Sequence, residues 1–501
     1  MKKTRKVIPL NRVEGDLELH LEMDDHVVTQ VRSVGTMYRG IENLMIGRGP
    51  MDSLVITPRI CGICTTAHLN AAAKALDMAY GVDIPDNAKR LRNVTLMVEQ
   101  LQNDVRHAVL LFMPDLIHTS YTHQPLFSEA FRRYAVLKGE ATLQTVQETK
   151  RLLEIIAILG GQWPHSSFMV PGGVVTVPAD SDIIHCRHIL LNFRKWYEDR
   201  ILGCALERLN GICSWQDLDA WLDESPDHHD SELGFFIRYA RALGLDRVGR
   251  AHDTFISCGG PDLPKDTAVG RQGELRGFAF AGFYSGQGVK PLDPHIIRED
   301  ISSSFFKDEQ PDRHPFEGRT VPLDGEGDDK KYTWAKAPRY GGQPAETGPL
   351  ADMVISGHPL FVETLEASGA SVLLRQMARL IRPAMLLPAI DQWLSEMVSC
   401  KGPFYKDYTK KVTSQGYGFI TAPRGFLGHW LKIENGHIVN YQVITPTAWN
   451  ASPTDANGVR GPWEEAIVGT SVRDTGDPIE VEHVVRSFDP CLVCTVHVID
   501  P

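Results

Sequence analysis

The sequence predicts an α+β fold that is predominantly helical, a large single domain built on a long-helix bundle with β-hairpins at its periphery. Four long stretches repeat apolar residues with the period of a helix, and two shorter stretches alternate like paired strands. With 501 residues, of which 43% are apolar, the chain can bury a large core. Because no stretch has the composition of an interdomain linker, we expect residues 1–501 to form a single domain.

The first predicted element is an N-terminal β-hairpin at about residues 12–35. Leucines alternate with other residues from Leu17 to Leu21, as in a strand with one buried face. A second apolar run, Val27 to Val34, follows the turn signal Asp24-Asp25. The two runs therefore predict an antiparallel pair.

A helical bundle is predicted at about residues 60–400. Its long segments are residues 86–109, 142–159, 183–202 and 371–399. Asp86 is a candidate N-cap of the first segment, and Pro383 and Pro388 are expected to bend or break the last. Residues 259–349 are rich in Gly, Pro and charged residues, and loops of this length are usually functional or wrap over a partner.

The C-terminal part, about residues 415–501, is predicted to combine strands with a metal-binding segment. Trp430 to Val443 has strand character and contains Glu434-Asn435-Gly436, a strong hairpin-turn signal. We expect a second hairpin here.

Charge and hydropathy exclude several classes of protein. The formal net charge of −11 has the wrong sign for binding nucleic acid through its phosphates. The basic start Met1 to Lys6 is followed by only four residues before Asn11 and Arg12, too short a run for a secretory signal. The longest apolar runs are also too short to span a bilayer. We expect no signal peptide and no transmembrane segment in this chain.

Two Cys-x-x-Cys pairs are the most informative feature of the sequence. Cys61 and Cys64 lie near one end of the chain, whereas Cys491 and Cys494 lie near the other. Thiolates spaced in this way can converge on one metal ion. Structural zinc is the commonest use of such pairs, but zinc ribbons place them about 15 to 20 residues apart. Here 426 residues intervene, so zinc, a redox metal and unrelated thiols all remain open at this point.

Polar residues around both pairs favour a tuned metal site over a purely structural one. Arg59 and His68 flank the first pair, and Asp489 and His497 flank the second. Each alone has an ordinary explanation. Together they indicate an outer shell that adjusts the metal and moves protons.

With their neighbours, the two pairs resemble the signature motifs of the large subunit of nickel-iron hydrogenases. The motifs are Arg59-x-Cys61-Gly62-x-Cys64-x-x-x-His68 and Asp489-Pro490-Cys491-x-x-Cys494-x-x-His497. Further matching stretches are Arg12-Val13-Glu14-Gly15, residues 35–42, 85–88, 313–316, 336–339, 422–425 and 449–453. The chain is therefore identified as a member of this family, and the resemblance implies the fold of its large subunit.

The resemblance implies a nickel-iron centre whose iron carries carbon monoxide and cyanide. Cys61 and Cys491 would be terminal ligands of nickel, and Cys64 and Cys494 would bridge nickel and iron. Soft thiolates suit nickel, which is consistent with this assignment.

Catalytic roles follow from the same resemblance. Either Cys494 or Arg424 would act as the base in the cleavage of dihydrogen, although an arginine is normally protonated and could serve instead as an electrostatic clamp. Glu14 would carry the proton onward. Arg424 and Thr447 would also donate hydrogen bonds to the cyanides. Which residue acts as the base, Cys494 or Arg424, stays open.

The resemblance also implies a second metal site. Glu42 and His497 would bind magnesium or a similar divalent cation behind the active site.

Three departures from the family pattern bear on physiology. Asp16 stands where many members have His, a form associated with the cytoplasmic-side uptake and hydrogen-sensing branch. Asn103 stands where many members have an acidic residue above the site, with Asp104 as a neighbour that would compensate and with His107 in its expected place. Residues 498–501 follow His497, where most members are cut by a maturation protease.

The expected partners are dihydrogen as substrate, an iron-sulfur small subunit and maturation factors for nickel, with a dimer of heterodimers as a further expectation. The five other cysteines form no cluster motif, so electrons must leave through another subunit. We expect a location in the cytoplasm or on the cytoplasmic face of the membrane. Two alternatives stay open: a hydrogen sensor with slow turnover and, less favoured because all four cysteines are present, a metal-free quinone-site subunit like that of complex I.

Overall fold

The computed structural model describes residues 3–10, 17–267, 281–307, 312–324 and 330–491. Strands and helices in these ranges pack around two buried apolar clusters, of which the larger extends through the helical bundle and both terminal sheets. The α+β, mainly helical fold predicted from the sequence is confirmed.

The N-terminal sheet contains the predicted hairpin and one strand more. β2 (Leu17–Asp24) pairs antiparallel with β3 (Val27–Gly35), and β1 (Lys3–Pro9) pairs with the other edge of β2. Alternate β2 side chains are buried, as the leucine alternation predicts. We did not predict β1, because its Lys and Arg residues conceal the alternation of a strand.

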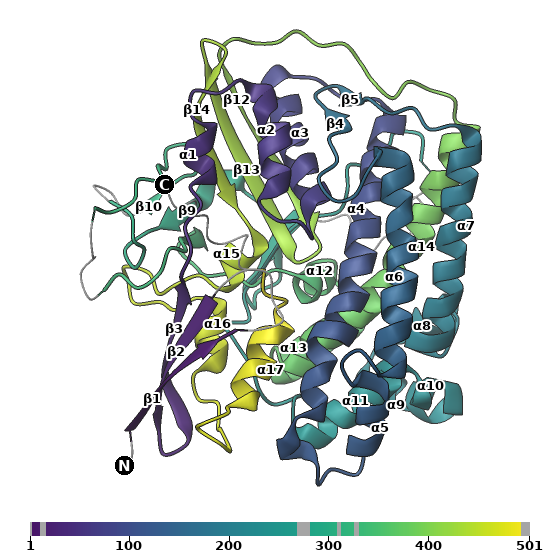
Figure 1. Cartoon of the computed structure of the whole chain (residues 1–501), viewed down its shortest axis with the longest axis vertical. Coiled ribbons are helices and arrows are strands. Elements are labelled where there is room, and N and C mark those ends of the chain that lie inside the picture. The colour runs from purple at the N-terminus through teal and green to yellow at the C-terminus, as the bar shows by residue number, and fades with distance from the viewer. Residues whose placement is uncertain (1–2, 11–16, 268–280, 308–311, 325–329, 492–501) are drawn as a thin grey trace.

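The helical bundle follows the predicted periodicity. α4 (Asp86–Arg106), α6 (Glu140–Gly160), α7 (Asp180–Trp196) and α14 (Val372–Ser399) lie side by side (Figure 1). The π-helical segments η3 (His107–Phe112) and η6 (Tyr197–Leu202) continue α4 and α7. Two details differ from the prediction. Asp86 is the first residue of its helix and Pro85 is the cap, and α14 continues through Pro383 and Pro388 because packing on α4 and α7 supports it.

The C-terminal sheet confirms the second hairpin. β12 (Ser414–Ala422), β13 (Gly425–Glu434) and β14 (His437–Ile444) form an antiparallel meander. The turn between β13 and β14 places Asn435 and Gly436 at φ 50° and 78°, the left-handed region in which Asn and Gly are favoured. The elements that pack on this sheet position the candidate site.

α3 (Thr65–Tyr80) packs directly on β12 through two glycines of the strand (Figure 1). A Cβ at Gly418 would lie 2.0 Å from the carbonyl oxygen of Ala71, and one at Gly416 would lie 2.2 Å from that of Ala75. Only glycine allows the helix backbone to approach so closely.

The middle region is less irregular than its composition suggests. Its described part holds short strands in two small sheets: β6 (Phe255–Cys258), β7 (Ala281–Tyr284), β8 (Val289–Pro291), β9 (Ile297–Asp300), β10 (Asp312–Arg313) and β11 (Ala337–Tyr340). Strands of two to four residues carry too little alternation to be predicted, since their pairing depends on tertiary contacts.

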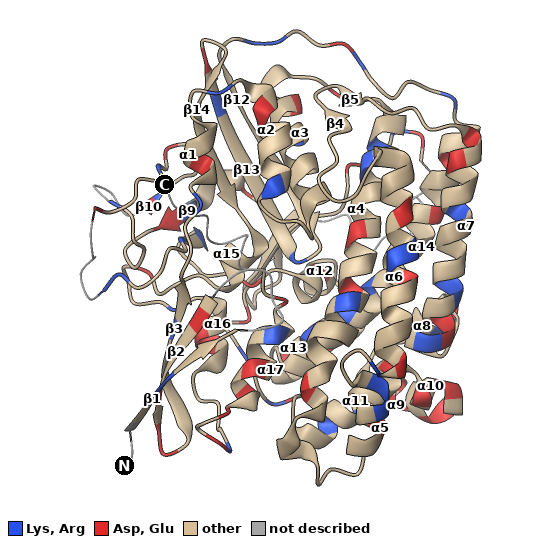
Figure 2. Ribbon diagram, viewed as in Figure 1, with Lys and Arg blue, Asp and Glu red and all other residues tan. Residues whose placement is uncertain are grey.

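Short elements connect these parts. They are α1 (Ile41–Met45), α2 (Ser53–Ile56), α5 (Phe127–Tyr134), β4 (Met169–Val170), β5 (Gly173–Val174), α8 (Leu206–Leu209), α9 (Trp215–Glu224), α10 (Pro226–Asp230), α11 (Glu232–Leu243), α12 (Pro349–Ile355), α13 (Pro359–Ser368), α15 (Pro446–Asn450), α16 (Pro462–Ile467) and α17 (Ile479–Ser487). Basic and acidic side chains are interspersed along the long helices (Figure 2). Within the described ranges, every helix is too short or too polar to cross a membrane.

Candidate metal centre

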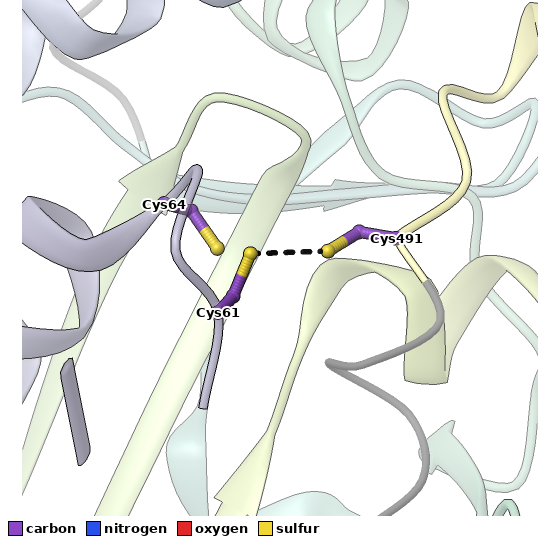
Figure 3. Close-up of side chains that lie close together, drawn as sticks. All are labelled: Cys61, Cys64 and Cys491. Atoms are coloured by element: carbon purple, nitrogen blue, oxygen red, sulfur yellow. Dashed lines mark hydrogen bonds between the residues drawn. The ribbon is translucent and has the colours of Figure 1, made fainter. Parts of the chain in front are cut away.

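Three of the four paired cysteines meet in the interior. Cys61 follows the short helix η2 (Thr57–Arg59), Cys64 is the residue before α3, and Cys491 follows α17. Their sulfur atoms all lie within 4.8 Å of one another, with 3.3 Å between Cys61 and Cys491. Figure 3 shows Cys491 facing the other two from the opposite side. All three are at most 5% exposed, so the fold joins the two ends of the chain at one thiol cluster.

A carboxylate from α4 holds the beginning of α3 immediately after Cys64. Glu99 accepts hydrogen bonds from the backbone N–H groups of Thr66 (2.9 Å) and Ala67 (3.1 Å) and from the indole of Trp163 (3.3 Å). These N–H groups belong to the first helical turn, which lacks intrahelical acceptors. Burial raises the pKa of Glu99 to about 7, although these three donors lower it. The sequence did not single out Glu99.

Asp489 lies next to the cluster and collects several polar groups. Arg424 donates from Nε to its Oδ1 at 2.9 Å, and Asn103 donates from Nδ2 to its Oδ2 at 2.7 Å. His107 and Arg379 lie within 3.7 and 3.9 Å. The backbone of Asp489 has φ 58°, a strained value that these contacts hold in place. Burial alone would raise the pKa of Asp489, but the positive charges around it lower it below its ordinary value.

A row of arginines on α14 anchors the segment before Cys491. The guanidinium of Arg375 lies 3.8 Å from the ring centroid of Phe488, and Arg379 donates to the carbonyl of Ser487 at 3.1 Å. Arg382 makes two hydrogen bonds to Asp104, of 2.8 and 2.7 Å. Asp104 therefore pairs with α14. It does not bind next to Asp489, so it does not replace the acidic residue that is absent at Asn103.

These arginines were not predicted, although their spacing carries a signal. Positions i, i+4 and i+7 of an otherwise apolar helix share one face, and all three side chains are buried. Buried arginines of this kind need acidic or carbonyl partners.

Arg424, at the turn between β12 and β13, is buried beside the thiols. Burial would lower its pKa, but Asp489 and the three cysteines raise it well above its ordinary value. Its Nη1 is buried and has no hydrogen-bond partner in the described part of the chain. The guanidinium therefore offers a free donor next to the cluster.

His68 begins a buried chain of hydrogen bonds that leads away from the thiols. Its Nδ1 lies 3.1 Å from Nε2 of His429 on β13, whose Nδ1 lies 2.8 Å from the hydroxyl of Tyr441 on β14. All three residues are at most 1% exposed. Nε2 of His68 is buried without a partner among the described residues. His429 and Tyr441 were not predicted, because only the folded sheet brings them to His68.

Two other predicted residues have different surroundings. The amide N–H of Cys491 donates to Oγ1 of Thr447 at 3.1 Å, and among the described residues no hydrogen bond donated by this hydroxyl is found. Arg59, expected beside the thiols, is exposed and donates to the carbonyl of Val55. Arg39 instead holds the backbone before Cys61, through a 2.5 Å hydrogen bond to the carbonyl of Ile60.

Glu42 lies on the wall of a polar cavity of about 530 Å³ that Thr320 and Gln442 also line. It is 6% exposed and accepts hydrogen bonds from the N–H of Val443 (2.9 Å), from Lys336 (3.0 Å) and from Thr320. Carboxylate, amide and hydroxyl oxygens are the donors that magnesium prefers. In the described residues the charge of Glu42 is balanced by Lys336.

Four predicted features lie outside the described residues: Glu14, Cys494, His497 and the segment 498–501. Asp16 lies outside them as well.

The described residues fit a metal centre with anionic ligands. Three convergent thiols supply soft donors, and Arg424 leaves a buried nitrogen beside them that has no partner among the described residues. Unpaired buried donors are costly, so such groups indicate an acceptor that completes them.

Comparison with known proteins gives a consistent result. Residues 39–123 and 244–497 match the family model described as nickel-dependent hydrogenase. The chain is 28% identical to the Hydrogenase-2 large chain of Escherichia coli, over 98% of this chain and 96% of that protein. It is 30% identical to the periplasmic [NiFeSe] hydrogenase large subunit of Desulfomicrobium baculatum, over 98% and 94%.

The fold agrees with these matches. A crystal structure of the H2-activated [NiFeSe] hydrogenase of the same Desulfomicrobium species superposes with a TM-score of 0.83 at 28% identity, over 99% of this chain and 100% of the other.

Proposed function

The chain belongs to the nickel-dependent hydrogenase family as a large subunit, and on this premise we propose that it cleaves dihydrogen heterolytically and passes the electrons to an iron-sulfur small subunit. The observation that carries the proposal is the buried meeting of Cys61, Cys64 and Cys491 beside the Nη1 donor of Arg424, which has no partner among the described residues. A structural zinc site would not require that donor.

We propose that Cys61, Cys64, Cys491 and Cys494 hold a nickel-iron centre with carbon monoxide and cyanide on the iron. When bound, the metal pair supplies the electron-pair acceptor that splitting an apolar molecule requires. The cysteines are buried, which excludes bulk water from the site.

Arg424 is proposed as a fixed cationic clamp. Its Nε hydrogen bond to Asp489 fixes the guanidinium plane, and the remaining Nη1 donates to an anionic ligand of the iron. The ion pair with Asp489 supports this role over that of a base, because it favours the protonated form. Thr447 has a hydroxyl hydrogen available for a second ligand. The proton would then be taken up by Cys494 and carried onward by Glu14.

Glu42 and His497 are proposed as ligands of a magnesium or similar cation. Support comes from the oxygen atoms of Thr320 and Gln442 in the same cavity as Glu42. His497 would contribute to this site from the C-terminal segment.

The names of the relatives support a small-subunit partner, since both are described as large chains or subunits of hydrogenases. We further propose hydrogen uptake on the cytoplasmic side, with assembly through maturation factors and a dimer of heterodimers. A hydrogen sensor with slow turnover is the second candidate, favoured by the Asn103 contact with Asp489 in place of an acidic pair. The turnover rate with an artificial acceptor separates the two roles.

Infrared spectroscopy and metal analysis of the purified complex test the proposal. We expect carbon monoxide and cyanide stretching bands and about one nickel per chain, both lost in Cys61→Ser, Cys64→Ser and Cys491→Ser. Cys213→Ser, which changes an exposed single cysteine, is the matched control and should keep both. Stoichiometric zinc without these bands would overturn the proposal.

A further inference from the structure

We propose that Glu99 is a positioning residue of the metal centre, which caps the N-terminus of α3 in place of Cys64 and so keeps the sulfur of Cys64 directed at the metals. The inference rests on the proposed function, because that function makes Cys64 a metal ligand. It gives a carboxylate on a different helix, α4, a part in setting the electronic state of the centre.

The first argument is the place of Cys64 in its helix. Cys64 is the N-cap residue of α3, so Thr66 and Ala67 occupy the second and third helical positions. The side chain of an N-cap residue ordinarily accepts a hydrogen bond from the backbone N–H of one of these positions. α11 follows this rule, because the hydroxyl of Ser231 accepts from the N–H of Gly234 at 3.0 Å. At α3 the same task would compete with metal binding, since both need the lone pairs of one sulfur.

The second argument is the direction of the Cys64 side chain. Its sulfur lies within 4.8 Å of the sulfurs of Cys61 and Cys491, and Figure 3 shows it facing that cluster. Cys64 makes no side-chain capping hydrogen bond to α3. The first turn of the helix therefore needs an acceptor from another part of the chain.

The third argument is that Glu99 supplies this acceptor with both of its oxygens. Oε2 accepts from the N–H of Thr66 at 2.9 Å, and Oε1 accepts from the N–H of Ala67 at 3.1 Å. The indole of Trp163 also donates to Oε2, at 3.3 Å, which helps to fix the plane of the carboxylate. These are the two N–H groups that an N-cap side chain would accept from. Glu99 thus performs the capping that Cys64 does not.

Burial makes this arrangement exclusive. Glu99, Thr66 and Ala67 are all 0% exposed, so bulk water cannot take the place of the carboxylate. A buried N–H without an acceptor is costly, and the acceptor that N-cap geometry offers next is the sulfur of Cys64. Hydrogen bonds to a ligating sulfur withdraw electron density and tune a metal centre. Loss of Glu99 should therefore shift the carbon monoxide stretching band to higher wavenumber.

Infrared spectra of the purified complex test the inference with two variants of Glu99. The spectra are recorded at about pH 8, above the pKa of about 7 that burial gives Glu99, so that the wild-type carboxylate is ionised. Glu99→Leu removes both acceptor oxygens and should give the larger shift to higher wavenumber. Glu99→Gln also removes the charge but keeps one acceptor oxygen, so it should give a smaller shift in the same direction.

Ser231→Ala is the matched control, because it removes a buried N-cap acceptor from a helix whose cap residue is not a cysteine. Its thermal midpoint should fall, as a lost cap requires, while its carbon monoxide band stays at the wild-type position. A general loss of helix stability would thus be recognised by a change in midpoint without a change in the band.

The outcomes separate capping from charge and from stability. A band that moves least in Ser231→Ala, further in Glu99→Gln and furthest in Glu99→Leu supports the inference. Equal shifts in the two Glu99 variants would assign the effect to the lost charge alone and overturn it, and so would a band at the wild-type position in both. If Glu99→Leu yields no complex, an unshifted band in Glu99→Gln overturns the inference. Absence of any such band in the wild-type complex would overturn the proposed function, and the inference with it.

Discussion

The side-chain amide of Asn103 donates a 2.7 Å hydrogen bond to Oδ2 of Asp489, while Arg424 donates to Oδ1 of the same carboxylate at 2.9 Å. Both oxygens of Asp489 therefore face donors. An acidic residue at position 103 would put two carboxyl groups in contact instead. The asparagine makes Asp489 a fully satisfied anion beside the thiols.

Asn103→Asp should lower the thermal midpoint of the complex more than Asn103→Leu does. The leucine variant loses one hydrogen bond to a buried charge, at about 1–3 kcal/mol, and the aspartate adds like-charge repulsion to that loss. Scanning calorimetry measures the change. Asn192→Asp on the exposed face of α7 is the control and should stay within about 0.5 kcal/mol of wild type. Equal midpoints for Asn103→Asp and wild type would contradict the assigned contact.

Arg382→Met should destabilise the protein by about 3–5 kcal/mol, because it leaves the buried carboxylates of Asp104 and Asp352 without their shared partner. It also removes a 2.6 Å hydrogen bond to the carbonyl of Pro423, the residue before Arg424. Arg187→Met is the matched control, because Arg187 forms a partly exposed ion pair with Asp391 that contributes at most about 1 kcal/mol. Thermal unfolding of both variants checks the difference, and similar midpoints would argue against a buried network.

Glu99→Gln should change how stability depends on pH. Burial raises the pKa of Glu99 from 4.5 to about 7, so the folded state holds this proton more tightly than the unfolded state between these values. The contribution of Glu99 to stability is therefore present at pH 4.5 and is lost as the pH rises to about 7. The stability of wild type relative to Glu99→Gln should fall by up to about 3 kcal/mol over this range.

Denaturant unfolding of the two proteins at pH 5, 6 and 7.5 measures this difference. Glu154→Gln, an exposed position on α6, should show the same pH dependence as wild type. A constant difference between wild type and Glu99→Gln would show that the helix N–H groups keep Glu99 ionised throughout.

Gly418→Ala should lower both stability and nickel content. The added methyl group would lie 2.0 Å from the carbonyl oxygen of Ala71 and 2.7 Å from the amide nitrogen of Ala75, so α3 must shift and carry Cys64 with it. Overpacking of this kind typically costs about 1–3 kcal/mol. Gly49→Ala is the control, because a Cβ there meets no atom within 4 Å. Thermal midpoints and nickel analysis of the two variants test this prediction. Unchanged nickel content in Gly418→Ala would contradict the claim that close packing of α3 on Gly418 positions Cys64.

Local patterns predict the elements with strong periodicity and miss those that depend on partners. The four long helices and both hairpins extend over enough residues for the apolar period to be clear. Asn435-Gly436 identifies its turn because the left-handed backbone there favours these residue types. β1 and the short strands from β6 to β11 were not predictable, since they form only when a neighbouring strand is present.

The residues of the candidate site also divide into those that a local pattern predicts and those that it does not. Cys61, Cys64 and Cys491 follow from motifs a few residues long, and so does Asp489. Their partners come from elsewhere in the chain. The contacts of Glu99, Arg382 and His429 depend on helix and sheet packing that no local pattern encodes, whereas the arginine spacing on α14 was a signal that could have been used.

The approach of Cys491 to Cys61 spans a sequence separation of 430 residues. A metal bound to both would turn the polypeptide into a closed ring with free ends of 60 and 10 residues. A single proteolytic cut in a connecting segment, such as residues 401–413 between α14 and β12, would open that ring without separating the two pieces. The nicked protein would remain one particle held by metal–sulfur bonds as well as by packing, and after removal of the metal only the packing would hold the fragments together.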